Sequence, residues 1–242
     1  MKVLIISDIH GNYDALRAVL EDAGSWDQLW VLGDLVDYGP EPEKIVDEIR
    51  DMRPEVLLRG NHDHAAAYNV DCGCGIRTHD ISVYTREHIT RKLLSEDQLE
   101  WLKNLDLKIE RSFSGGKIIL VHGSPRSPLY DYMLPSLPKN ILMEMIGSIA
   151  DEPSRSLVVF GHTHLGTNML LKNSVLLNPG SVGQPRDGDP RASYAIFDLE
   201  SMDFRIIRVK YEVEKVVGKL RELVKDGAVM KKLSSIYMNG RV

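Results

Sequence analysis

Metal-ligating side chains recur along the chain in five short blocks, each directly after an apolar run. The blocks are Asp8-Ile9-His10, Gly33-Asp34, Gly60-Asn61-His62-Asp63, His122-Gly123 and Gly161-His162-Thr163-His164. One histidine after an apolar run is usually an ordinary hydrogen-bonded residue, but five such endings in one chain are a much stronger signal. Carboxylate and amide oxygens together with imidazole nitrogens suit Mn²⁺, Fe or Zn²⁺, whereas a structural zinc site would need clustered thiolates. The blocks therefore predict a catalytic metal centre.

The same blocks resemble, in order, the D-x-H, G-D, G-N-H-[DE], H-G and G-H-x-H motifs of the calcineurin-like metallophosphoesterase superfamily. The match runs from Asp8 to His164, and every block is present. The later segment Asn178-Pro179-Gly180-Ser181-Val182-Gly183 is similar to the one that follows in the small bacterial and archaeal phosphodiesterase branch. The resemblance implies a metal-dependent hydrolase of phosphate esters.

The resemblance also implies two divalent metal ions and a set of seven ligands. One ion would be held by Asp8, His10 and His164, the other by Asn61, His122 and His162, with Asp34 bridging the two. A shared anionic ligand offsets the repulsion between neighbouring cations. We expect Mn²⁺, with Fe, Zn²⁺, Ni²⁺ or Mg²⁺ as alternatives. The ions would clamp phosphate oxygens and acidify a bridging water, so that a metal-bridging hydroxide attacks phosphorus in line.

His62 stands outside the ligand set and resembles the general acid of the family. Such an acid supplies a proton or hydrogen bond as the leaving oxygen gains charge. Asp37 is its expected orienting partner, because the run from Gly33 to Gly39 is similar to the G-D-x-V-D-R-G block of serine/threonine protein phosphatases. The alternative for Asp37 is a solvated carboxylate in a turn-prone loop.

Tyr38 departs from that block, which has an arginine that grips phosphate in the protein phosphatases and in the bacterial diadenosine tetraphosphatases. Bidentate phosphate recognition is therefore lost at this position, which argues against protein phosphatase activity. Asn12, Arg126 and Arg186 are the candidates for substrate contact. The plainer interpretation of the two arginines is exposed surface, where most arginines lie.

The elements that must position these residues follow from the spacing of apolar side chains. Apolar strand-like runs and helical patterns alternate at 3–6, 13–23, 29–32, 43–52 and 56–58, and a helical stretch follows from 65 to 105. Five later strands are expected at 157–160, 169–171, 175–177, 194–197 and 204–209. This alternation predicts βαβ units and a sheet covered on both faces. From the five apolar runs that end in ligands, we expect an α/β fold, a four-layer αββα sandwich of two mixed sheets flanked by helices, with the site at the carboxyl ends of its strands.

Composition and length limit the partners of such a fold. We expect one domain over 1–210, with a C-terminal helix and tail over 211–242 packed on the same domain. The net charge of -5 and the pI near 5.9 provide no basic footprint, so no stable nucleic-acid complex is expected. No apolar stretch reaches the roughly 18 residues that span a bilayer, and no signal-peptide cleavage site is evident, which predicts a cytoplasmic protein without membrane association.

The leading hypothesis is a phosphodiesterase whose partner is a small or nucleotide-like phosphate ester. A phosphomonoesterase or dinucleoside polyphosphate hydrolase is the alternative within enzymes, and homo-oligomerisation stays open. Outside enzymes, the alternative is a protein-binding scaffold such as the retromer subunit of this fold, which is disfavoured because every ligand and His62 are present. Cys72 and Cys74 are interpreted as small residues under a loop, because a second cysteine pair for a zinc site is absent.

Overall fold

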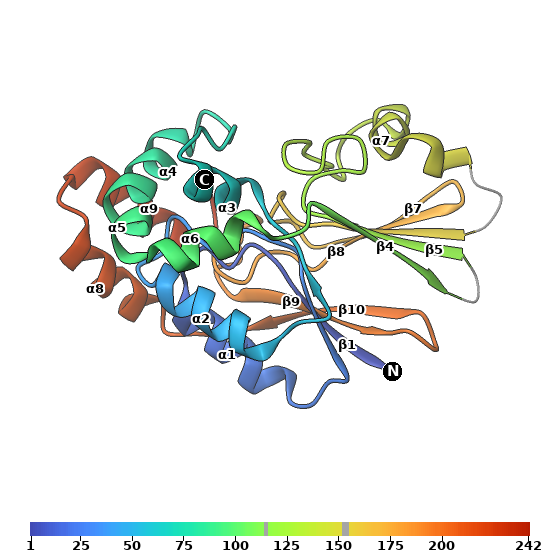
Figure 1. The fold of residues 1–242 in the computed structure, drawn as a ribbon, viewed down its shortest axis with the longest axis horizontal. Helices are drawn as coiled ribbons and strands as arrows, with labels where there is room; N and C mark the ends of the chain where they lie inside the picture. The colour runs from blue at the N-terminus through green and yellow to red at the C-terminus, as the bar shows by residue number, and fades with distance from the viewer. Residues whose placement is uncertain (114–115, 152–154) are drawn as a thin grey trace.

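Two five-stranded mixed sheets pack face to face and are covered by helices on their outer sides (Figure 1). The computed structural model describes residues 1–113, 116–151 and 155–242. Within these residues, the strand order is β10-β9-β1-β2-β3 in the first sheet and β4-β5-β6-β8-β7 in the second. The expected α/β sandwich of two mixed sheets is confirmed.

The first sheet has three parallel strands followed by two antiparallel ones. Its strands are β1 (Lys2–Ile6), β2 (Gln28–Val31), β3 (Val56–Leu57), β9 (Ala192–Asp198) and β10 (Asp203–Val209). β1, β2 and β3 run parallel, and β9 pairs antiparallel with both β1 and β10. The parallel strands are connected through α1 (Tyr13–Ala23) and α2 (Pro42–Met52). This arrangement gathers the carboxyl ends of β1, β2 and β3 at one edge.

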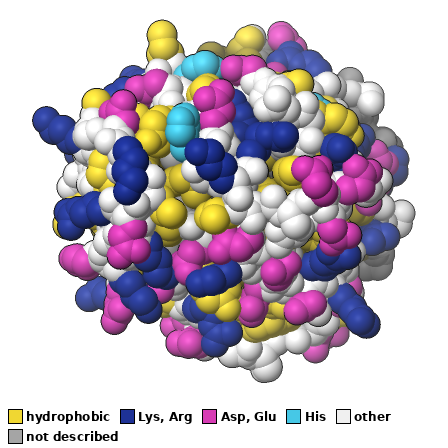
Figure 2. Space-filling model, turned by 60° about the vertical axis from the view of Figure 1, so that its left-hand side comes forward, with side chains coloured by type: hydrophobic (Ala, Val, Ile, Leu, Met, Phe, Trp, Pro, Cys, Tyr) yellow, Lys and Arg dark blue, Asp and Glu magenta, His cyan; other side chains and the backbone are white. Residues whose placement is uncertain are grey.

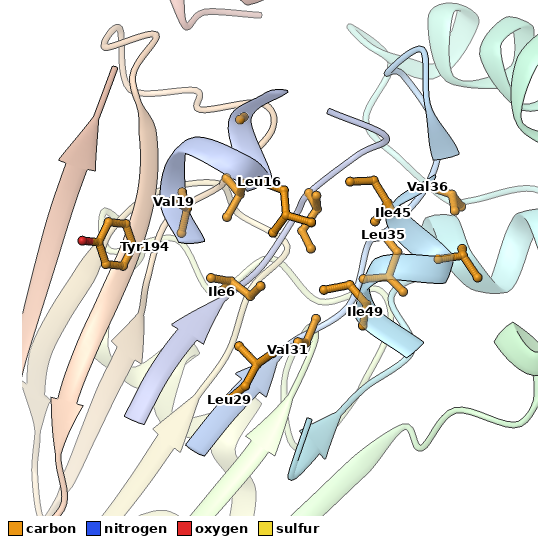
Figure 3. Close-up of a cluster of buried hydrophobic side chains, with 14 of the residues drawn as sticks. Ile6, Leu16, Val19, Leu29, Val31, Leu35, Val36, Ile45, Ile49 and Tyr194 are labelled. Atoms are coloured by element: carbon orange, nitrogen blue, oxygen red, sulfur yellow. The ribbon is translucent and has the colours of Figure 1, made fainter. Parts of the chain in front are cut away.

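Alternation along β1 divides its side chains between two cores. Leu4 and Ile6 belong to the core beneath α1 and α2, whereas Val3 and Ile5 face the second sheet. Figure 3 shows the first of these cores, in which side chains spaced three or four residues apart on each helix point at the sheet. Its labelled helix residues are Leu16, Val19, Ile45 and Ile49.

The second sheet is parallel in its middle and antiparallel at both edges. Its strands are β4 (Lys108–Phe113), β5 (Gly116–Val121), β6 (Arg155–Val159), β7 (Thr167–Leu171) and β8 (Ser174–Asn178). β5, β6 and β8 run parallel, while β4 and β7 are antiparallel to their neighbours. The helix α7 (Lys139–Ile146) and the short 3₁₀ helix η2 (Gly147–Asp151) pack on the outer face. β5 and β6 therefore end at the same edge of their sheet.

The remaining helices gather at one end of the sandwich (Figure 1). They are α3 (Asn61–Tyr68), α4 (His79–Thr85), the π-helix η1 (Arg86–Thr90), α5 (Arg91–Leu93), α6 (Glu96–Lys103), α8 (Val213–Leu223) and α9 (Gly227–Asn239). The expectation of a tail after the first C-terminal helix was wrong. Asp226 caps a second helix by accepting hydrogen bonds from two backbone N–H groups, and α9 buries an apolar stripe against α4 and α8.

The surface carries charges of both signs. Figure 2 shows acidic and basic side chains interspersed over the face that it presents, without a continuous basic stripe. No helix in the described part of the chain is both long and apolar enough to cross a membrane.

Lys219 of α8 connects the C-terminal helices to the starts of α1 and α2. Its Nζ lies 2.5 Å from Asp14 Oδ2 and 2.5 Å from Glu41 Oε2, and both carboxylates are largely buried. We expect Lys219→Met to lower the free energy of unfolding by about 1–2 kcal/mol, because two largely buried carboxylates each lose one of their two cations. Urea denaturation measures the change. Lys215→Met is the matched control, since Lys215 also pairs with Asp14 but is 56% exposed, and it should cost below about 0.5 kcal/mol.

The deficit of Lys219→Met should depend on pH. Burial raises the pKa of Asp14, but hydrogen bonds from Lys219 and Lys215 outweigh burial and hold the pKa below its ordinary 3.8. Asp14 therefore stabilises the fold above pH 3.8, and this contribution is lost as the pH falls through the lower folded-state pKa. Wild type and variant should converge in acid. An unchanged deficit in acid would mean that Lys219 acts through packing alone.

Candidate metal centre

The predicted ligand blocks lie at the carboxyl ends of five strands, four of them in loops and one at the start of α3. Asp8 and His10 follow β1, Asp34 follows β2, Asn61 follows β3, His122 follows β5, and His162 and His164 follow β6. The structure brings them together in two groups whose ligand atoms lie within 4.8 Å of one another. One group is Asp8, His10, Asp34 and His164, and the other is Asp34, His122 and His162. Asp34 is therefore shared, and Asn61 Oδ1 adjoins the second group at 3.1 Å from His122 Nε2.

Backbone carbonyls fix the orientation of three of these imidazoles. Nδ1 of His10 lies 2.9 Å from the Val36 carbonyl oxygen, and Nδ1 of His122 lies 2.8 Å from that of Leu32. Nδ1 of His164 likewise lies 2.5 Å from the carbonyl oxygen of Gln184. A carbonyl can only accept, so each Nδ1 carries the proton, and in the neutral ring Nε2 keeps its lone pair. His10 Nε2 and His164 Nε2 then face each other at 3.3 Å with no proton between them, an arrangement that suits a shared cation.

Buried polar atoms without a partner give a second test of whether these residues fit a metal. Asp8 Oδ2, Asp34 Oδ2 and His162 Nε2 are inaccessible to solvent and form no hydrogen bond in the structure. A buried, unsatisfied oxygen or nitrogen is costly unless it binds an ion or water. These atoms converge on the two groups and are of the types that divalent transition metals prefer. The residues therefore fit two divalent cations.

Electrostatics differ among the four ligand imidazoles. Burial lowers the pKa of His122, but the charge of Asp34 outweighs burial and raises that pKa to about 9. Burial lowers the pKa of His10 to about 3, and it lowers the pKa values of His162 and His164 well below the ordinary value. These rings are therefore neutral and able to ligate. Burial alone would raise the pKa of Asp34, but the imidazoles of His122 and His62 outweigh burial and hold that pKa well below 3.8. The shared carboxylate is therefore ionised.

His62 lies beside the two groups and is held by Asp37. His62 Nδ1 donates to Asp37 Oδ2 at 2.9 Å, and both side chains are buried. Burial lowers the pKa of His62, but the charge of Asp34 and the hydrogen bond to Asp37 outweigh burial and raise it to about 9. Arg86 of η1 also donates to Asp37 Oδ2, at 3.4 Å. Asp37 is thus a buried partner of His62, and the alternative of a solvated loop carboxylate does not fit the structure.

A buried carboxylate that is not a ligand, Asp63, organises the loop after β2. It accepts backbone N–H bonds from Asp34, Leu35 and Gly60 at 2.8–2.9 Å. The loops approach so closely that a Cβ on Gly60 would lie 2.0 Å from Asp34 Oδ1. Asp63 therefore fixes the backbone of Asp34, the shared ligand, through these hydrogen bonds.

The loops also hold their residues in an uncommon backbone conformation. In the described part of the chain, seven of the eleven non-glycine residues with positive φ belong to them. These seven are Asp8, His10, Asp34, Asp37, Tyr38, His162 and His164. Left-handed backbone is unfavourable for residues with a Cβ and concentrates at functional sites.

Comparison with known proteins agrees with this geometry. The family model of the calcineurin-like phosphoesterase superfamily domain matches residues 1–202. The chain belongs to the calcineurin-like phosphoesterase superfamily. It is 32% identical to the uncharacterized protein MJ0912 of Methanocaldococcus jannaschii over 236 residues, covering 90% of this chain and 91% of that protein.

Two further relatives place the chain in the small bacterial and archaeal branch of the superfamily. The crystal structure of a metallophosphoesterase from Sphaerobacter thermophilus superposes with a TM-score of 0.77 at 32% identity, covering 97% of this chain and 99% of that one. Phosphodiesterase YfcE of Escherichia coli is 26% identical over 209 residues, covering 82% of this chain and 88% of YfcE. The superfamily depends on dinuclear metal centres, in line with the two candidate groups.

The position at which other superfamily members have an arginine is filled by a packing residue. Tyr38 is fully buried, and its ring lies 4.9 Å from the rings of both His10 and His62. Its backbone N–H donates to Thr85 Oγ1 at 3.1 Å. Tyr38 therefore supports the imidazoles and offers no cation to a phosphate.

The three substrate-contact candidates differ in where the structure places them. Asn12 is buried and caps α1, since its Oδ1 accepts from Ala15 N and its Nδ2 donates to the Gly183 carbonyl. Arg126 is not brought to the two groups, because its guanidinium pairs with Asp131 at 3.0 Å beside a separate cavity of about 430 Å³. Arg186 lines a cavity together with Thr163, which lies between His162 and His164. Burial raises the pKa of Asp8 to about 6 and lowers that of His164, and the charge of Arg186 lowers both to a smaller extent. Substrate contact by any of the three stays a prediction.

Two features near the site had no clear sequence signal. Cys72 and Cys74 are buried beside His62, and the three ligand atoms lie within 4.8 Å of one another, close enough to hold a soft cation. Tyr132 lies against His162, with the ring centroids 3.8 Å apart. Both come from loops whose path no local pattern predicts.

Proposed function

We propose that this protein is a dinuclear-metal phosphodiesterase that hydrolyses small or nucleotide-like phosphodiesters. The observation that carries the proposal is the pair of buried ligand groups that share Asp34 beside His62, a buried imidazole outside both groups. Asp8, His10 and His164 would hold one ion, and Asn61, His122 and His162 the other. Mn²⁺ is the expected metal. Two divalent cations in such groups supply positive charge to phosphate oxygens and make water acidic enough to become a nucleophile near neutral pH.

His62 would deliver the proton that the leaving group needs. An alkoxide leaves poorly unless its oxygen is protonated as the bond to phosphorus breaks. The 2.9 Å bond from His62 Nδ1 to Asp37 fixes the ring and leaves Nε2 for proton transfer. Arg86 donates a hydrogen bond to Asp37 Oδ2 and so holds that carboxylate in place. Asp37 and Arg86 therefore act as positioning residues for the acid.

The cation content of the site favours diesters over more highly charged substrates. A diester carries one negative charge, whereas monoesters and dinucleoside polyphosphates carry more and are commonly gripped by several cations. A tyrosine, Tyr38, stands where an arginine would supply one such cation, and the guanidinium of Arg126 is paired with Asp131. The name of the relative YfcE, a phosphodiesterase, points the same way.

A substrate screen tests the proposal. Purified protein is loaded with Mn²⁺ and supplied with bis(4-nitrophenyl) phosphate, 4-nitrophenyl phosphate or a dinucleoside tetraphosphate. We expect kcat/KM for the diester to exceed that for the monoester by roughly tenfold or more. Chelation should abolish turnover, and added Mn²⁺ should restore it.

Each other outcome has a defined meaning. Faster hydrolysis of the monoester or of the dinucleoside tetraphosphate would replace the proposal with the corresponding alternative activity. Full turnover by the chelated protein would exclude the metal mechanism, and no turnover of any ester with Mn²⁺ bound would favour a binding role.

A further inference from the structure

A cavity of about 440 Å³ opens beside the histidines of the candidate metal centre. Thr163, which separates His162 from His164, lines it. Tyr132 lines it as well, and the ring of Tyr132 lies against His162 with centroids 3.8 Å apart. The volume falls within the range of small-molecule sites. The cavity therefore adjoins the candidate metal centre.

Two arginines line this cavity although the whole chain is acidic. Arg77 and Arg186 line it, and no aspartate or glutamate is among its described lining residues. Arg186 is held by two hydrogen bonds to Gln184 Oε1, at 3.2 and 2.8 Å. The backbone carbonyl of Gln184 also accepts from His164 Nδ1. One short segment thus positions both a ligand histidine and a cation, which suits a substrate that is anionic at the end near the metals.

Apart from two threonines, the remaining side chains that line the cavity are largely apolar. Leu165 and Tyr132 line it, both half-buried. Ile76, on the loop between α3 and α4, also lines it and is 93% exposed, the most exposed large apolar side chain among the described residues. A single exposed apolar residue is common on protein surfaces. At the rim of a cavity, however, such a side chain can be removed from water when a bound apolar group covers it, and this burial is favourable.

We propose that this cavity binds an aromatic substituent of the phosphodiester, while the phosphate lies toward Arg186 and the ligand groups. The inference rests on the proposed function and narrows its substrate class to diesters that carry an aromatic ring, as aryl esters and nucleosides do. Ile76, Leu165 and Tyr132 supply the apolar contact, and Arg186 supplies the charge at the phosphate end. A methyl ester is too small to cover these three side chains.

Binding of two phosphonates isolates the contribution of the ring. Phenylphosphonate and methylphosphonate share an anionic head, and their C–P bonds are not esters, so neither is consumed. We expect calorimetry on the Mn²⁺-loaded protein to give roughly tenfold tighter binding of phenylphosphonate, because burial of the ring removes apolar surface from water. Ile76→Ser should reduce this ratio by roughly threefold or more and leave methylphosphonate affinity unchanged. Leu165→Ser should act in the same direction.

Leu170→Ser is the matched control, since Leu170 lies on β7, is 65% exposed and does not line the cavity. It should leave the ratio at the wild-type value. Ile76→Ser removes a side chain that is almost fully exposed, so loss of fold cannot explain its effect. Equal affinities of the two phosphonates for the wild type, or an unchanged ratio in Ile76→Ser, would overturn the inference. This readout needs no turnover, so failure of the proposed hydrolysis is seen separately, in the ester screen.

A turnover arm separates the two sources of an aromatic ring. Thymidine 5′-(4-nitrophenyl phosphate) and methyl 4-nitrophenyl phosphate release the same phenol and differ in the other substituent. A higher kcat/KM for the thymidine diester that falls in Ile76→Ser would assign the cavity to a nucleoside. Equal values, together with preferential binding of phenylphosphonate, would assign it to a small aryl group.

Discussion

Asp34→Asn is expected to reduce phosphodiester hydrolysis by more than about 10³-fold, the largest effect of any single substitution in this protein. Among the described residues, Asp34 is the only one that belongs to two of the candidate ligand groups. Its Oδ2 lies 3.2 Å from His122 Nε2 and 3.6 Å from His10 Nε2. An amide at this position is neutral, so two neighbouring cations would lose the anion that offsets their repulsion. Bound metal per chain should fall together with kcat.

Metal analysis and steady-state kinetics on the same preparation check this result. Asp203→Asn is the control. Asp203 lies on β10, its side chain is 55% exposed, and it belongs to none of the candidate ligand groups. It should leave both quantities unchanged. Retention of two metals at the wild-type rate by Asp34→Asn would show that the shared carboxylate is not a bridge.

His62→Ala is expected to keep both metals but lose roughly 10²–10⁴-fold in kcat on alkyl diesters, with a much smaller change in KM. His62 contributes no ligand atom to the two groups that share Asp34. Its removal should therefore empty neither position. A nitrophenyl diester has an acidic leaving group that departs without a proton, so its hydrolysis should be affected far less.

Asp37→Asn is the companion variant, because Asp37 touches the acid and not the ligand groups. It should show a weaker form of the same preference for nitrophenyl esters. Metal content and kcat on an alkyl and a nitrophenyl diester distinguish the possibilities. Equal losses on both substrates, or loss of a metal ion in His62→Ala, would mean that His62 is a ligand or a phosphate clamp.

The ligand blocks could be predicted because each depends on a local pattern. An apolar strand followed by a turn delivers its next residues to the edge of a sheet, and parallel strands share that edge. The same logic predicted the two mixed sheets. The local pattern could not show where the side chains of Asn12 and Arg126 would lie. Their hydrogen-bond partners, Gly183 and Asp131, depend on how the loops pack.

Other features of the site depend on contacts between distant segments. Arg86 lies in a π-helix within a stretch that reads as ordinary helix, and only the fold brings it to Asp37, 49 residues earlier. Cys72 and Cys74 read as loop residues, and their approach to His62 follows from the path of the loop between α3 and α4. The second C-terminal helix was different, because Asp226 and the apolar spacing after it were readable as a capped helix.

The left-handed backbone of the site residues bears on how this protein would respond to selection for heat resistance. A residue with a Cβ costs about 1 kcal/mol in that conformation, and glycine would relieve the cost. At His10, His162 or His164, glycine would also delete a ligand. Laboratory evolution in a chelating medium should therefore discard these residues early, whereas the same selection with Mn²⁺ present should keep them. Metal supply, more than temperature, would then determine which lineages remain enzymes.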